Sequence, residues 1–481
     1  MVDHISFAMN RNSLERRILI PKYYDPELAE AAELASDRYD LPRLGELLLP
    51  GEAGSRLGTW VARENYGTGP VPYVRTSDLN DWRIRPDFKK AVSSEVYKSV
   101  ELRQDVRVND LLMVAHGTYL VGAVAIVTDE DLPLVLQDHV FRLRVDQRKI
   151  DPFLLLVALS TRFVRRQIRA KQFSADIIDK IGNRHLDVRI PLPKNERKRE
   201  LSAKNAREFI AAHSEIRMKM SQLLTSDLRM TKERAAARYA FQTRRNDIVD
   251  RILIPKFYDP VLRADLDQSI EESGVPWTSL GDLVNAGILE ANTGAEVGKM
   301  AYGTGDIPFI RTTDIASLEV KAVPRQGISQ AIYDQYAEKA AIAEGDVILV
   351  RDGTYLVGSS AIVSSEDVPA IFCGGLYRLR SLDRLVLSPF SLLALLNLPV
   401  VRRQMRAKQF TRDVIDTLGK RIFEVRIPDP SSSYAMILGK KLARVMESKD
   451  AVRALAREAI RFIEPDLPKS LRNRPAWSMS A

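Results

Sequence analysis

The sequence has very little cysteine and no long apolar run. Cys373 is the only cysteine among 481 residues, which excludes a disulfide framework and a zinc site built on cysteine ligands. The longest apolar stretch, residues 153–159, is too short to span a bilayer, and residues 1–17 lack the apolar segment of a signal peptide. We therefore expect a cytoplasmic protein that does not associate with membranes.

Positive charge is only slightly in excess of negative charge. Lys and Arg number 72 against 63 Asp and Glu, which gives a net charge of +9. This excess is compatible with nucleic-acid binding and equally with ordinary solubility, so charge alone decides nothing. Hydrophobic residues make up 45% of the chain, and its length favours two to four domains with cores of their own.

What the sequence does contain is an internal duplication. The segment IPKYYDP at 20–26 returns as IPKFYDP at 254–260. Three further pairs follow in the same order: YGTG at 66–69 and 302–305, GTYLVG at 117–122 and 353–358, and a basic segment at 164–173 and 401–410. The spacing between equivalent segments stays nearly constant along the chain, and the unit is far too long for a solenoid repeat. The chain is therefore a tandem duplication.

Each copy has the same predicted order of elements. A short extended arm (18–26 and 252–260) leads into a β-rich domain, one helix beginning at Pro152 or Pro389 runs into the basic segment, and a strand closes the domain at 188–191 or 425–428. The predicted strands are 110–114, 121–127 and 139–145, with counterparts at 346–350, 357–363 and 376–379. This order predicts an α+β fold with two tandem β-rich domains.

A long helix with one narrow apolar stripe follows each domain. The stripes consist of Phe209, Ala212, Ile216, Met220, Leu223 and Leu224, and of Leu438, Leu442, Val445, Val452, Leu455, Ala459 and Phe462. Such spacing favours an antiparallel, coiled-coil-like pair that holds the domains apart, although each helix could instead pack on its own domain. The predicted boundaries are 1–26 (arm), 27–193 (domain 1), 194–250 (spacer 1), 251–430 (arm and domain 2), 431–464 (spacer 2) and 465–481 (flexible tail).

The sequence shows no catalytic site shared by the two copies. The five histidines lack ligand-like spacing, and the repeat replaces His116 with Asp352 and His139 with Gly375, so no metal site is predicted. The glycine-rich stretches 51–58 and 294–299 do not form a phosphate loop, and no methyltransferase or dinucleotide signature is present.

One arrangement resembles a magnesium-dependent nuclease. Asp314, Glu319 and Lys321 could form a D…E-x-K set, but the first copy has Asp78, Arg83 and Arg85 in the matching places. A surface strand with alternating charges explains these residues better, and a self-contained nuclease stays open as an alternative.

The basic segment is the strongest indication of nucleic-acid binding. It carries Arg165, Arg166, Arg169, Lys171 and Gln172, and again Arg402, Arg403, Arg406, Lys408 and Gln409. Guanidinium groups suit phosphate oxygens because they present paired planar donors. The alternative is a solvated helix face with local ion pairs, but few acids occur nearby in the sequence before Asp176 and Asp413. We therefore predict phosphate contacts here.

The repeated YGTG turns form a second candidate interface. Its residues are Arg63, Tyr66, Thr68 and Arg75 in the first copy, and Lys299, Tyr302, Thr304 and Arg311 in the second. The glycines would let the backbone approach another group closely. Arg75 and Arg311 could contact guanine or phosphate, or could instead pair with Asp78 and Asp314 and hold the turn.

Taken in order, these motifs resemble the specificity subunit of Type I restriction–modification systems. The matching segments are 71–79 and 307–315, 345–354 (with Asn109 replacing the glycine in the first copy), 141–144 and 377–380, the basic helices, and the R-I-P strands. No single motif is diagnostic, but the duplicated series covers nearly the whole chain.

The resemblance implies that each domain reads one half of a split target in double-stranded DNA and that the two long helices form a spacer. It also implies two docked methyltransferase subunits, with S-adenosylmethionine in those partners and no cofactor in this chain, with or without a translocating nuclease subunit. Two features depart from the family pattern: the arms, and the close similarity of the two copies. They suggest a divergent, phage-defence branch. A non-catalytic protein-interaction scaffold is the second alternative.

Overall fold

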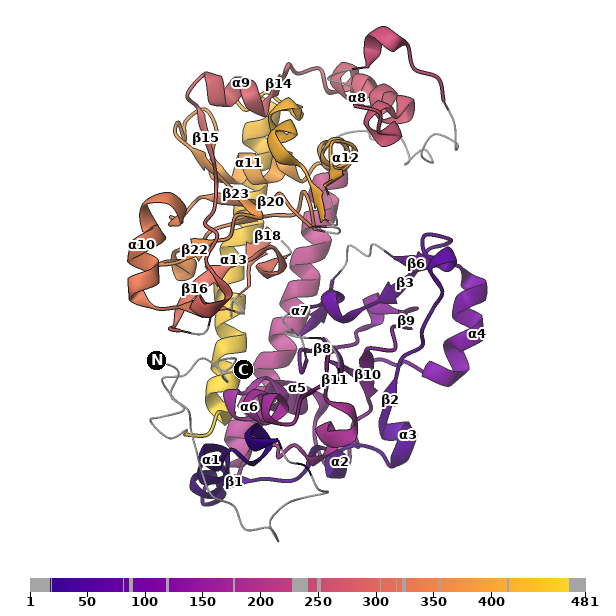
Figure 1. Ribbon diagram of the computed structural model, residues 1–481, viewed down its shortest axis with the longest axis vertical. Coiled ribbons are helices and arrows are strands. Elements are labelled where there is room, and N and C mark those ends of the chain that lie inside the picture. The colour runs from indigo at the N-terminus through magenta and orange to yellow at the C-terminus, as the bar shows by residue number, and fades with distance from the viewer. Residues whose placement is uncertain are drawn as a thin grey trace. The chain divides into compact units, whose positions relative to one another are not determined.

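The computed structural model describes residues 18, 20–80, 82–85, 90–117, 121–175, 178–226, 241–248, 252–302, 304–316, 318–321, 326–353, 356–412 and 415–466. Residues 1–17 of the expected arm and 467–481 of the expected tail lie outside this set. The chain forms two compact units (Figure 1). Unit 1 comprises Met1–Ala211, Gly303–Gly305 and Val452–Ala481, and unit 2 comprises Ala212–Tyr302 and Asp306–Ala451.

A 3-10 turn and a helix precede each β-rich domain, where the sequence predicts an extended arm. Turn η3 (Pro21–Tyr24) leads into α1 (Pro26–Ser36), and η9 (Pro255–Tyr258) leads into α8 (Pro260–Ser273). Asp25 and Asp259 cap these helices with their side chains, and proline follows at the first helical position. The predicted extended arm is therefore wrong, because Asp-Pro here is a helix start.

Unit 1 contains two small sheets and three strand pairs in its described part. The first sheet has the order β2 (Ser55–Leu57), β10 (Val140–Leu143), β7 (Leu111–Val114), β8 (Val124–Ile126), and the second has the order β6 (Ala91–Val92), β3 (Val71–Val74), β9 (Val135–Leu136). The pairs are β1 (Tyr39–Asp40) with β13 (Leu192–Pro193), β4 (Leu79–Asn80) with β5 (Arg83–Ile84), and β11 (Phe173–Ala175) with β12 (Ile178–Lys180). Helices α2 (Leu44–Leu47), α3 (Gly51–Gly54) and α4 (Ser94–Gln104) complete the domain.

Unit 2 repeats this arrangement. Its six-stranded sheet has the order β15 (Leu289–Thr293), β23 (Leu376–Ser381), β20 (Val347–Val350), β21 (Ser360–Ile362), β18 (Leu318–Val320), β17 (Ile315–Ala316). The other strands are β19 (Gly327–Ile328), β16 (Ile307–Ile310) and β22 (Ile371–Phe372) in one sheet, and the pairs β14 (Trp277–Ser279) with β26 (Arg426–Pro428) and β24 (Phe410–Arg412) with β25 (Ile415–Thr417). Helices α9 (Leu280–Asn285) and α10 (Gln330–Ala340) complete the domain. The predicted α+β fold class is confirmed.

The two copies share strand register as well as sequence. In unit 1, Leu111 pairs with Leu143, and in unit 2 the equivalent Val347 pairs with Leu379. The residue two positions before each of these strands explains one sequence difference: Asn109 and Gly345 have φ angles of 68° and 88°. Glycine and asparagine are the residues that most readily adopt this left-handed conformation, so asparagine can replace the glycine of the motif.

Two of the repeated motifs meet in an ion pair inside each domain. Arg144 binds Asp110 through Nε and Nη2 at 2.8 Å each, and Arg380 binds Asp346 in the same way at 2.7 Å. Each pair joins neighbouring strands of a sheet, because the arginine follows β10 or lies in β23 while the aspartate precedes β7 or β20. These residues therefore recur for a structural reason, since a bidentate guanidinium–carboxylate pair fixes both distance and orientation.

The single helix predicted after each sheet is two helices. In unit 1, α5 (Pro152–Ser160) ends at Thr161, whose hydroxyl caps α6 (Arg162–Ala170). In unit 2, α11 (Pro389–Leu396) is followed by α12 (Pro399–Ala407), which begins at a proline. A capping threonine and a helix-starting proline each interrupt the helical hydrogen bonds.

The closing strands differ between the copies. Strand β26 (Arg426–Pro428) lies within the predicted 425–428, whereas in unit 1 the strand is β13, Leu192–Pro193, beyond the predicted 188–191. Only an isolated bridge between Arg189 and Arg43 lies within the predicted range.

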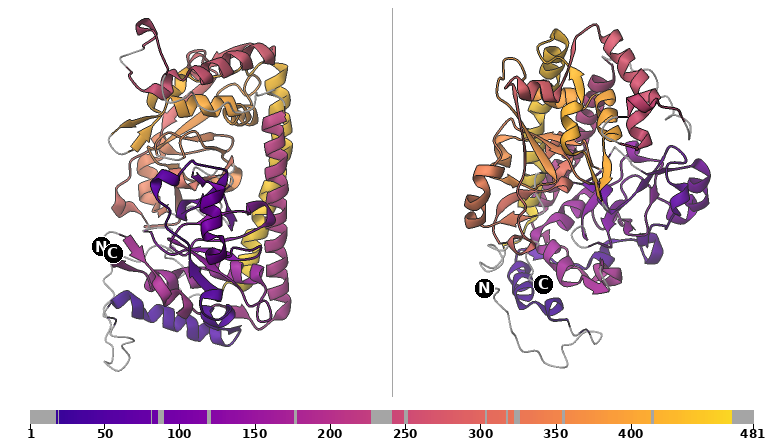
Figure 2. Two further views of the ribbon diagram at one scale, coloured as in Figure 1. Left: turned by 90° about the vertical axis from the view of Figure 1, so that its right-hand side faces the viewer. Right: turned by 45° about the horizontal axis from the view of Figure 1, so that its top comes forward.

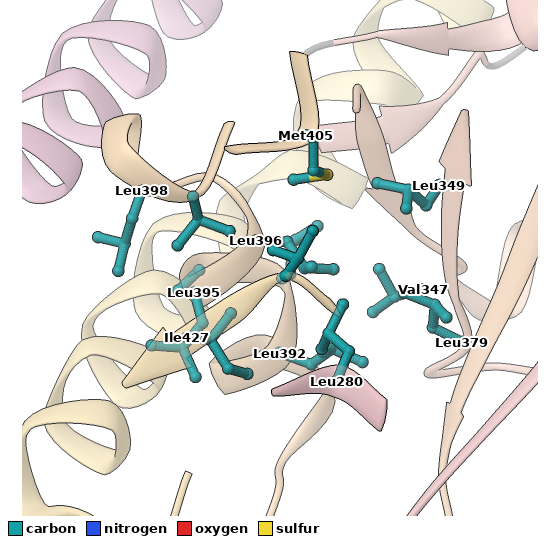
Figure 3. Close-up of a cluster of buried hydrophobic side chains, with 14 of the residues drawn as sticks. Leu280, Val347, Leu349, Leu379, Leu392, Leu395, Leu396, Leu398, Met405 and Ile427 are labelled. Carbon is teal, nitrogen blue, oxygen red and sulfur yellow. The ribbon is translucent and has the colours of Figure 1, made fainter. Parts of the chain in front are cut away.

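Helix α11 forms the centre of the hydrophobic core of unit 2. Figure 3 shows its leucines Leu392, Leu395 and Leu396 gathered with Val347 of β20 and Ile427 of β26. Because α11 is buried between a sheet and a strand, its residues from Ser391 to Leu396 are buried on all sides. The neighbouring α12 contributes Met405 to the same core, which orients the basic side chains of α12 away from it.

The long helices are α7 (Glu196–Ser226) and α13 (Ser433–Ile463), each of 31 residues. The boundary between the units falls within both helices, so each unit contains part of α7 and part of α13. In unit 1, Ser202 Oγ donates to Ala459 O at 3.0 Å and Asn205 Nδ2 donates to Glu458 at 3.0 Å, which defines an antiparallel pair (Figure 2). In unit 2, Leu223 of α7 shares a core with Leu438 and Leu442 of α13.

The apolar stripes also face the domains. Phe209 of α7 contacts Trp82 of unit 1 with ring centroids 5.2 Å apart, and Leu438 of α13 lies in the core of unit 2. The two interpretations of the stripes therefore hold together: the helices pair, and each also packs on a domain. On α13 the stripe is shifted by one residue at two positions: Met446 and Ile463 are buried, whereas the predicted Val445 and Phe462 are half-buried.

Candidate nucleic-acid interface

The basic helices α6 and α12 are anchored by their uncharged residues. Gln167 accepts from Arg189 N at 2.8 Å and donates to Arg189 O at 2.9 Å, and Gln404 clamps Arg426 with the same two bonds at 2.9 and 2.8 Å. Side-chain amides can satisfy both backbone groups of an extended residue in this way. This clamp fixes each basic helix against the closing segment of its domain.

The structure brings acidic helices against the basic ones. Helix α8 packs on α12 and α1 packs on α6 (Figure 1). Helix α1 carries Glu27, Glu30 and Glu33 and no basic residue, and α8 carries four acids and one arginine. Phosphate contacts are predicted partly because few acids occur near the basic segment in the sequence. In the folded chain the acids of α1 and α8 lie close to it, so this part of the prediction is wrong.

In unit 2, two predicted DNA-binding residues have carboxylate partners within the chain. Arg403 Nη1 donates to the buried carboxylate of Asp265 in α8. Lys408 Nζ lies 2.6 Å from Glu424 Oε2. Arg402 is half-buried, Arg406 is exposed, and Gln409 is buried.

In unit 1 the basic helix is covered more deeply. Arg166 and Gln172 are buried, and Arg165, Arg169 and Lys171 are half-buried. The carboxylate of Glu464, which follows α13, accepts from the backbone N–H groups of Arg162 and Phe163 at 2.8 and 3.2 Å and so caps α6. Burial raises the pKa of Glu464, and these two hydrogen bonds act in the opposite sense.

The turns η3 and η9 are held by alternating cations and aromatic rings. In unit 1, Lys171 Nζ lies 4.4 Å from the Tyr23 ring centroid, Tyr23 packs on Phe173, and the Arg184 guanidinium lies 4.0 Å from the Phe173 centroid. The equivalent distances in unit 2, from Lys408 to Phe257 and from Arg421 to Phe410, are 4.8 and 3.8 Å. This contact gives the repeated IPK[YF]YDP motif a structural role in both copies.

The YGTG turns lie over the strand that follows them. Tyr66 stacks on Tyr73 with ring centroids 5.5 Å apart, and Tyr302 stacks on Phe309 at 5.7 Å. Thr68 Oγ1 donates to Asn65 O at 2.8 Å and accepts from Ser93 N at 3.1 Å. The close approach predicted for these glycines occurs within the chain in the first copy, since a Cβ on Gly69 would lie 2.6 Å from Ser93 Cα.

The other predicted residues of the turns divide between exposed positions and positions with contacts inside the turn. Arg63 and Thr304 are exposed, whereas the side chain of Lys299 lies outside the described part of the structure. Arg75 Nε lies 3.5 Å from Asp78 Oδ2, and the Arg311 guanidinium lies 5.4 Å from the Tyr302 centroid. Of the two predicted roles for Arg75, the pairing with aspartate is therefore present, and contact with guanine or phosphate stays a prediction.

The three residues of the nuclease-like arrangement have structural contacts. Asp314 is fully buried and accepts from Arg311 N at 2.9 Å, and Lys321 N donates to the backbone O of Asp314 at 2.9 Å. Glu319 Oε1 lies 3.7 Å from Lys449 Nζ of α13. The expected surface strand is also wrong, because Glu319 and Lys321 are buried.

Two histidines that are distant in sequence lie side by side. The ring centroids of His116 and His139 are 4.7 Å apart, and burial lowers the pKa of His116.

Within the described residues, no group of three or more His, Cys, Asp or Glu side chains could hold a metal ion. Nor does any helix in that part of the chain combine the length and apolarity needed to cross a membrane.

The sequence missed the helices α1 and α8 as part of this surface. The pattern that could have found them is Asp-Pro followed by a run rich in Glu, Ala and Leu, which occurs at 25–35, with a similar run after Asp259-Pro260. Their acidic character would then have predicted a basic neighbour.

No family model and no curated protein matches the chain. Among solved structures it is similar to a Type I restriction–modification system S subunit from M. genitalium, with 11% identity, a TM-score of 0.35, and coverage of 89% of this chain and 97% of that chain. It is also similar to the HsdS subunit from Thermoanaerobacter tengcongensis, with 18% identity, a TM-score of 0.27, and coverage of 90% and 96%. A chain from a study of complex assembly and conformational transition of the type I R-M system shows 17% identity, a TM-score of 0.26, and coverage of 88% and 97%.

Proposed function

We propose that this chain is a sequence-specific DNA-binding subunit that directs a partner DNA adenine methyltransferase to a bipartite target. The observation that carries the proposal is the duplication of a whole domain, with the same motifs and strand register, on a pair of long helices. Two equivalent domains offer two equivalent reading surfaces, and a split target in double-stranded DNA matches that arrangement.

The antiparallel helices support the two-fold character of the target. In unit 1, α7 and α13 run in opposite directions, and a target whose two half-sites run in opposite senses matches a helix pair of this kind. A helix of 31 residues is roughly 45 Å long at about 1.5 Å per residue. Along B-DNA, which rises about 3.4 Å per base pair, this length corresponds to a separation on the order of 10–15 base pairs.

The interface residues that we propose are the eighteen predicted from the two motifs. Within this set the surface positions Arg63, Thr68, Thr304 and Arg406 are the first candidates for direct contact, because they are exposed. The buried Arg166, Gln172 and Gln409 would act by holding the basic helix in place. The carboxylate partners of Arg403 and Lys408 predict fewer phosphate contacts from unit 2 than its charge suggests.

The proposal assigns chemistry to the partners and none to this chain. Two methyltransferase subunits, with S-adenosylmethionine bound in them, would dock on the paired helices, with or without a restriction or other defence subunit. The contacts of Asp314 and Glu319 support this division, because one caps a turn and the other pairs with Lys449. The whole complex would act in the cytoplasm.

Methylome sequencing of a host with and without this gene tests the proposal. The expected result is one split motif whose methylation requires both this chain and its methyltransferase. A chimera with two copies of residues 27–193 on the native helices should methylate an inverted repeat of the first half-site. Continued methylation of the original asymmetric sequence would reject the assignment of one half-site to each domain.

The two rival functions give different results with the isolated chain. Magnesium-dependent cleavage that Glu319→Ala abolishes would favour the nuclease. Salt-independent binding to a protein, with no DNA binding even when the methyltransferase is present, would favour the interaction scaffold.

A further inference from the structure

Equivalent strand segments connect each domain to a long helix of its own unit. In unit 1, Trp82 precedes β5 and packs against Phe209 of α7 with ring centroids 5.2 Å apart and an interplanar angle of 73°. The guanidinium of Arg83 lies 5.6 Å from the centroid of the same ring. Trp82 and Phe209 are both buried, so this contact is aromatic and largely dry.

Unit 2 makes the equivalent contact with different chemistry. When the YGTG and GTYLVG segments of the two copies are aligned, Leu318 and Glu319 occupy the positions of Trp82 and Arg83. Leu318 keeps the unusual backbone, with a φ of 67° against 68° for Trp82. Glu319 Oε1 lies 3.7 Å from Lys449 Nζ of α13, and the Lys449 side chain is only 3% exposed. An aromatic contact in one unit is thus a buried ion pair in the other.

The hydrogen bonds made at the ends of α5 and α11 also differ between the units. Trp82 Nε1 donates to Ser160 Oγ at 2.7 Å in unit 1. Unit 2 has no indole at Leu318, and Asn397, which replaces Ser160, donates instead to Ser360 Oγ at 2.7 Å. The two units therefore place different polar side chains behind the equivalent strand segment, a serine that accepts from an indole in unit 1 and an asparagine that donates to a serine in unit 2.

The helices differ at the corresponding positions too. When the first residues of α7 and α13 are aligned, Met446 corresponds to Phe209 and Lys449 corresponds to Ala212. A lysine against Arg83 would bring two cations together, and an alanine opposite Glu319 would remove the Lys449 ammonium from a buried carboxylate. Each strand segment therefore suits the helix that it contacts and does not suit the other.

We propose that these contacts form a pairing key that assigns each β-rich domain to one helix, domain 1 to α7 and domain 2 to α13. Under the proposed function, on which this consequence rests, the key sets which half-site is read at which end of the spacer. Residues 82–104 and 318–338 diverge between the copies while the basic helices agree, and the reading of different half-sites would be one reason for that divergence. At least at Trp82, Arg83, Leu318 and Glu319, the copies diverge because they contact different helices, and not only because they read different bases.

The key is tested in the full-length chain without DNA. Leu318→Trp with Glu319→Arg places the unit 1 residues against α13, opposite Lys449. We expect faster amide hydrogen exchange in β18 and β21, with the local opening equilibrium raised on the order of a hundredfold, since the buried Lys449 ammonium loses the Glu319 carboxylate and gains a guanidinium beside it. Adding Met446→Phe and Lys449→Ala gives α13 the residues that α7 has at these two positions. These substitutions should restore most of the protection from exchange. Exchange in unit 1 serves as the internal control.

A second set of variants separates a specific pairing from general damage. Glu319→Gln and Lys449→Met should each raise the opening equilibrium of unit 2, and the double variant should be less damaging than the two effects multiplied. Two results would overturn the key. One is that the effects of Glu319→Gln and Lys449→Met multiply strictly, and the other is that Met446→Phe with Lys449→Ala does not restore protection in the variant with Leu318→Trp and Glu319→Arg. Both measurements report on folding, so they stand even if the chain proves not to bind DNA.

The domain-duplication chimera supplies a functional test. With residues 27–193 in both positions, the second copy meets Lys449, so methylation of the inverted repeat should need Met446→Phe and Lys449→Ala. Equal methylation with and without these two substitutions would overturn the key, while absence of methylation by the native complex would reject the proposed function instead.

Discussion

The carboxylate of Asp265 in α8 accepts a hydrogen bond from the guanidinium of Arg403 in α12, 138 residues further along the chain. The Asp265 side chain is only 3% exposed, and that of Arg403 is 19% exposed. When the two IPK[YF]YDP segments are aligned, the first copy has Ala31 at the position of Asp265. The two basic helices therefore differ in their internal charge compensation although their sequences are nearly identical.

Removing Asp265 should change both stability and DNA binding. We expect Asp265→Ala to cost about 1–3 kcal/mol of the free energy of unfolding, because Arg403 loses a charged hydrogen bond in a mostly buried setting. If Arg403 then contacts phosphate, the log–log salt slope should steepen by roughly 0.9. Denaturant unfolding and DNA titrations over a range of salt concentrations measure the two effects. A weaker salt dependence would contradict the idea that Asp265 competes with phosphate.

The basic helices should carry a sequence-independent part of DNA affinity. Replacing Arg165, Arg169, Arg402 and Arg406 with Ala should weaken binding to all sequences alike, and each lost phosphate contact should reduce the salt slope by roughly 0.9. Arg107→Ala and Arg384→Ala, at exposed positions outside the predicted interface, are the controls. A loss of sequence preference with an unchanged slope would show that these arginines read bases.

Unit 1 should lose stability in mild acid because of His185. This imidazole is buried, with Nδ1 at 2.6 Å from Gly182 O and Nε2 at 2.8 Å from Ser55 Oγ, and burial lowers its pKa to about 4. The unfolded chain takes up the proton near pH 6.5, whereas the folded chain resists it until about pH 4. The contribution of the neutral His185 to the free energy of unfolding is therefore fully present above pH 6.5. It falls by about 3 kcal/mol as the pH drops to 4.

Unit 2 offers a matched control for this titration. Its equivalents of His185 and Ser55 are Ile422 and Ala291. We expect His185→Ile with Ser55→Ala to flatten the pH dependence of unit 1 between pH 4 and 6.5, measured by amide exchange of β2 and β10. An unchanged pH dependence in this variant would assign the titration to another group.

The left-handed residue two positions before β20 should tolerate asparagine better than a branched side chain. Gly345 has a φ of 88°, and Asn109 occupies the equivalent position with a φ of 68°. We expect Gly345→Asn to cost less than about 1 kcal/mol and Gly345→Val to cost clearly more, because branched residues are strained in this region. Thermal unfolding of the two variants compares them directly, and equal costs would show that crowding by Arg384 and Pro389 dominates.

The isolated chain should neither cleave nor methylate DNA, with or without magnesium and S-adenosylmethionine. Glu319 pairs with Lys449 and Asp314 caps a turn, so Glu319→Ala should affect stability and not a cleavage reaction. A nuclease assay on the purified chain, with the variant beside it, is decisive because contaminating activity would survive the substitution.

The sequence alone determined the duplication, the α+β class and the two long helices. These depend on local patterns: repeated segments, alternating or three- to four-residue apolar spacing, and turn residues. The split of each predicted helix into α5 and α6, or α11 and α12, was also readable in principle, since Thr161 and Pro399 are helix start signals.

The tertiary structure decided what the charged residues contact. Asp265 reaches Arg403, Glu464 reaches the start of α6, and Glu319 reaches Lys449, each pair lying far apart in the sequence. Electrostatic partners depend on distance in space, and a linear pattern contains no such distances. The sequence could therefore identify a basic helix, but only the fold could show that acidic helices and carboxylates compensate part of its charge.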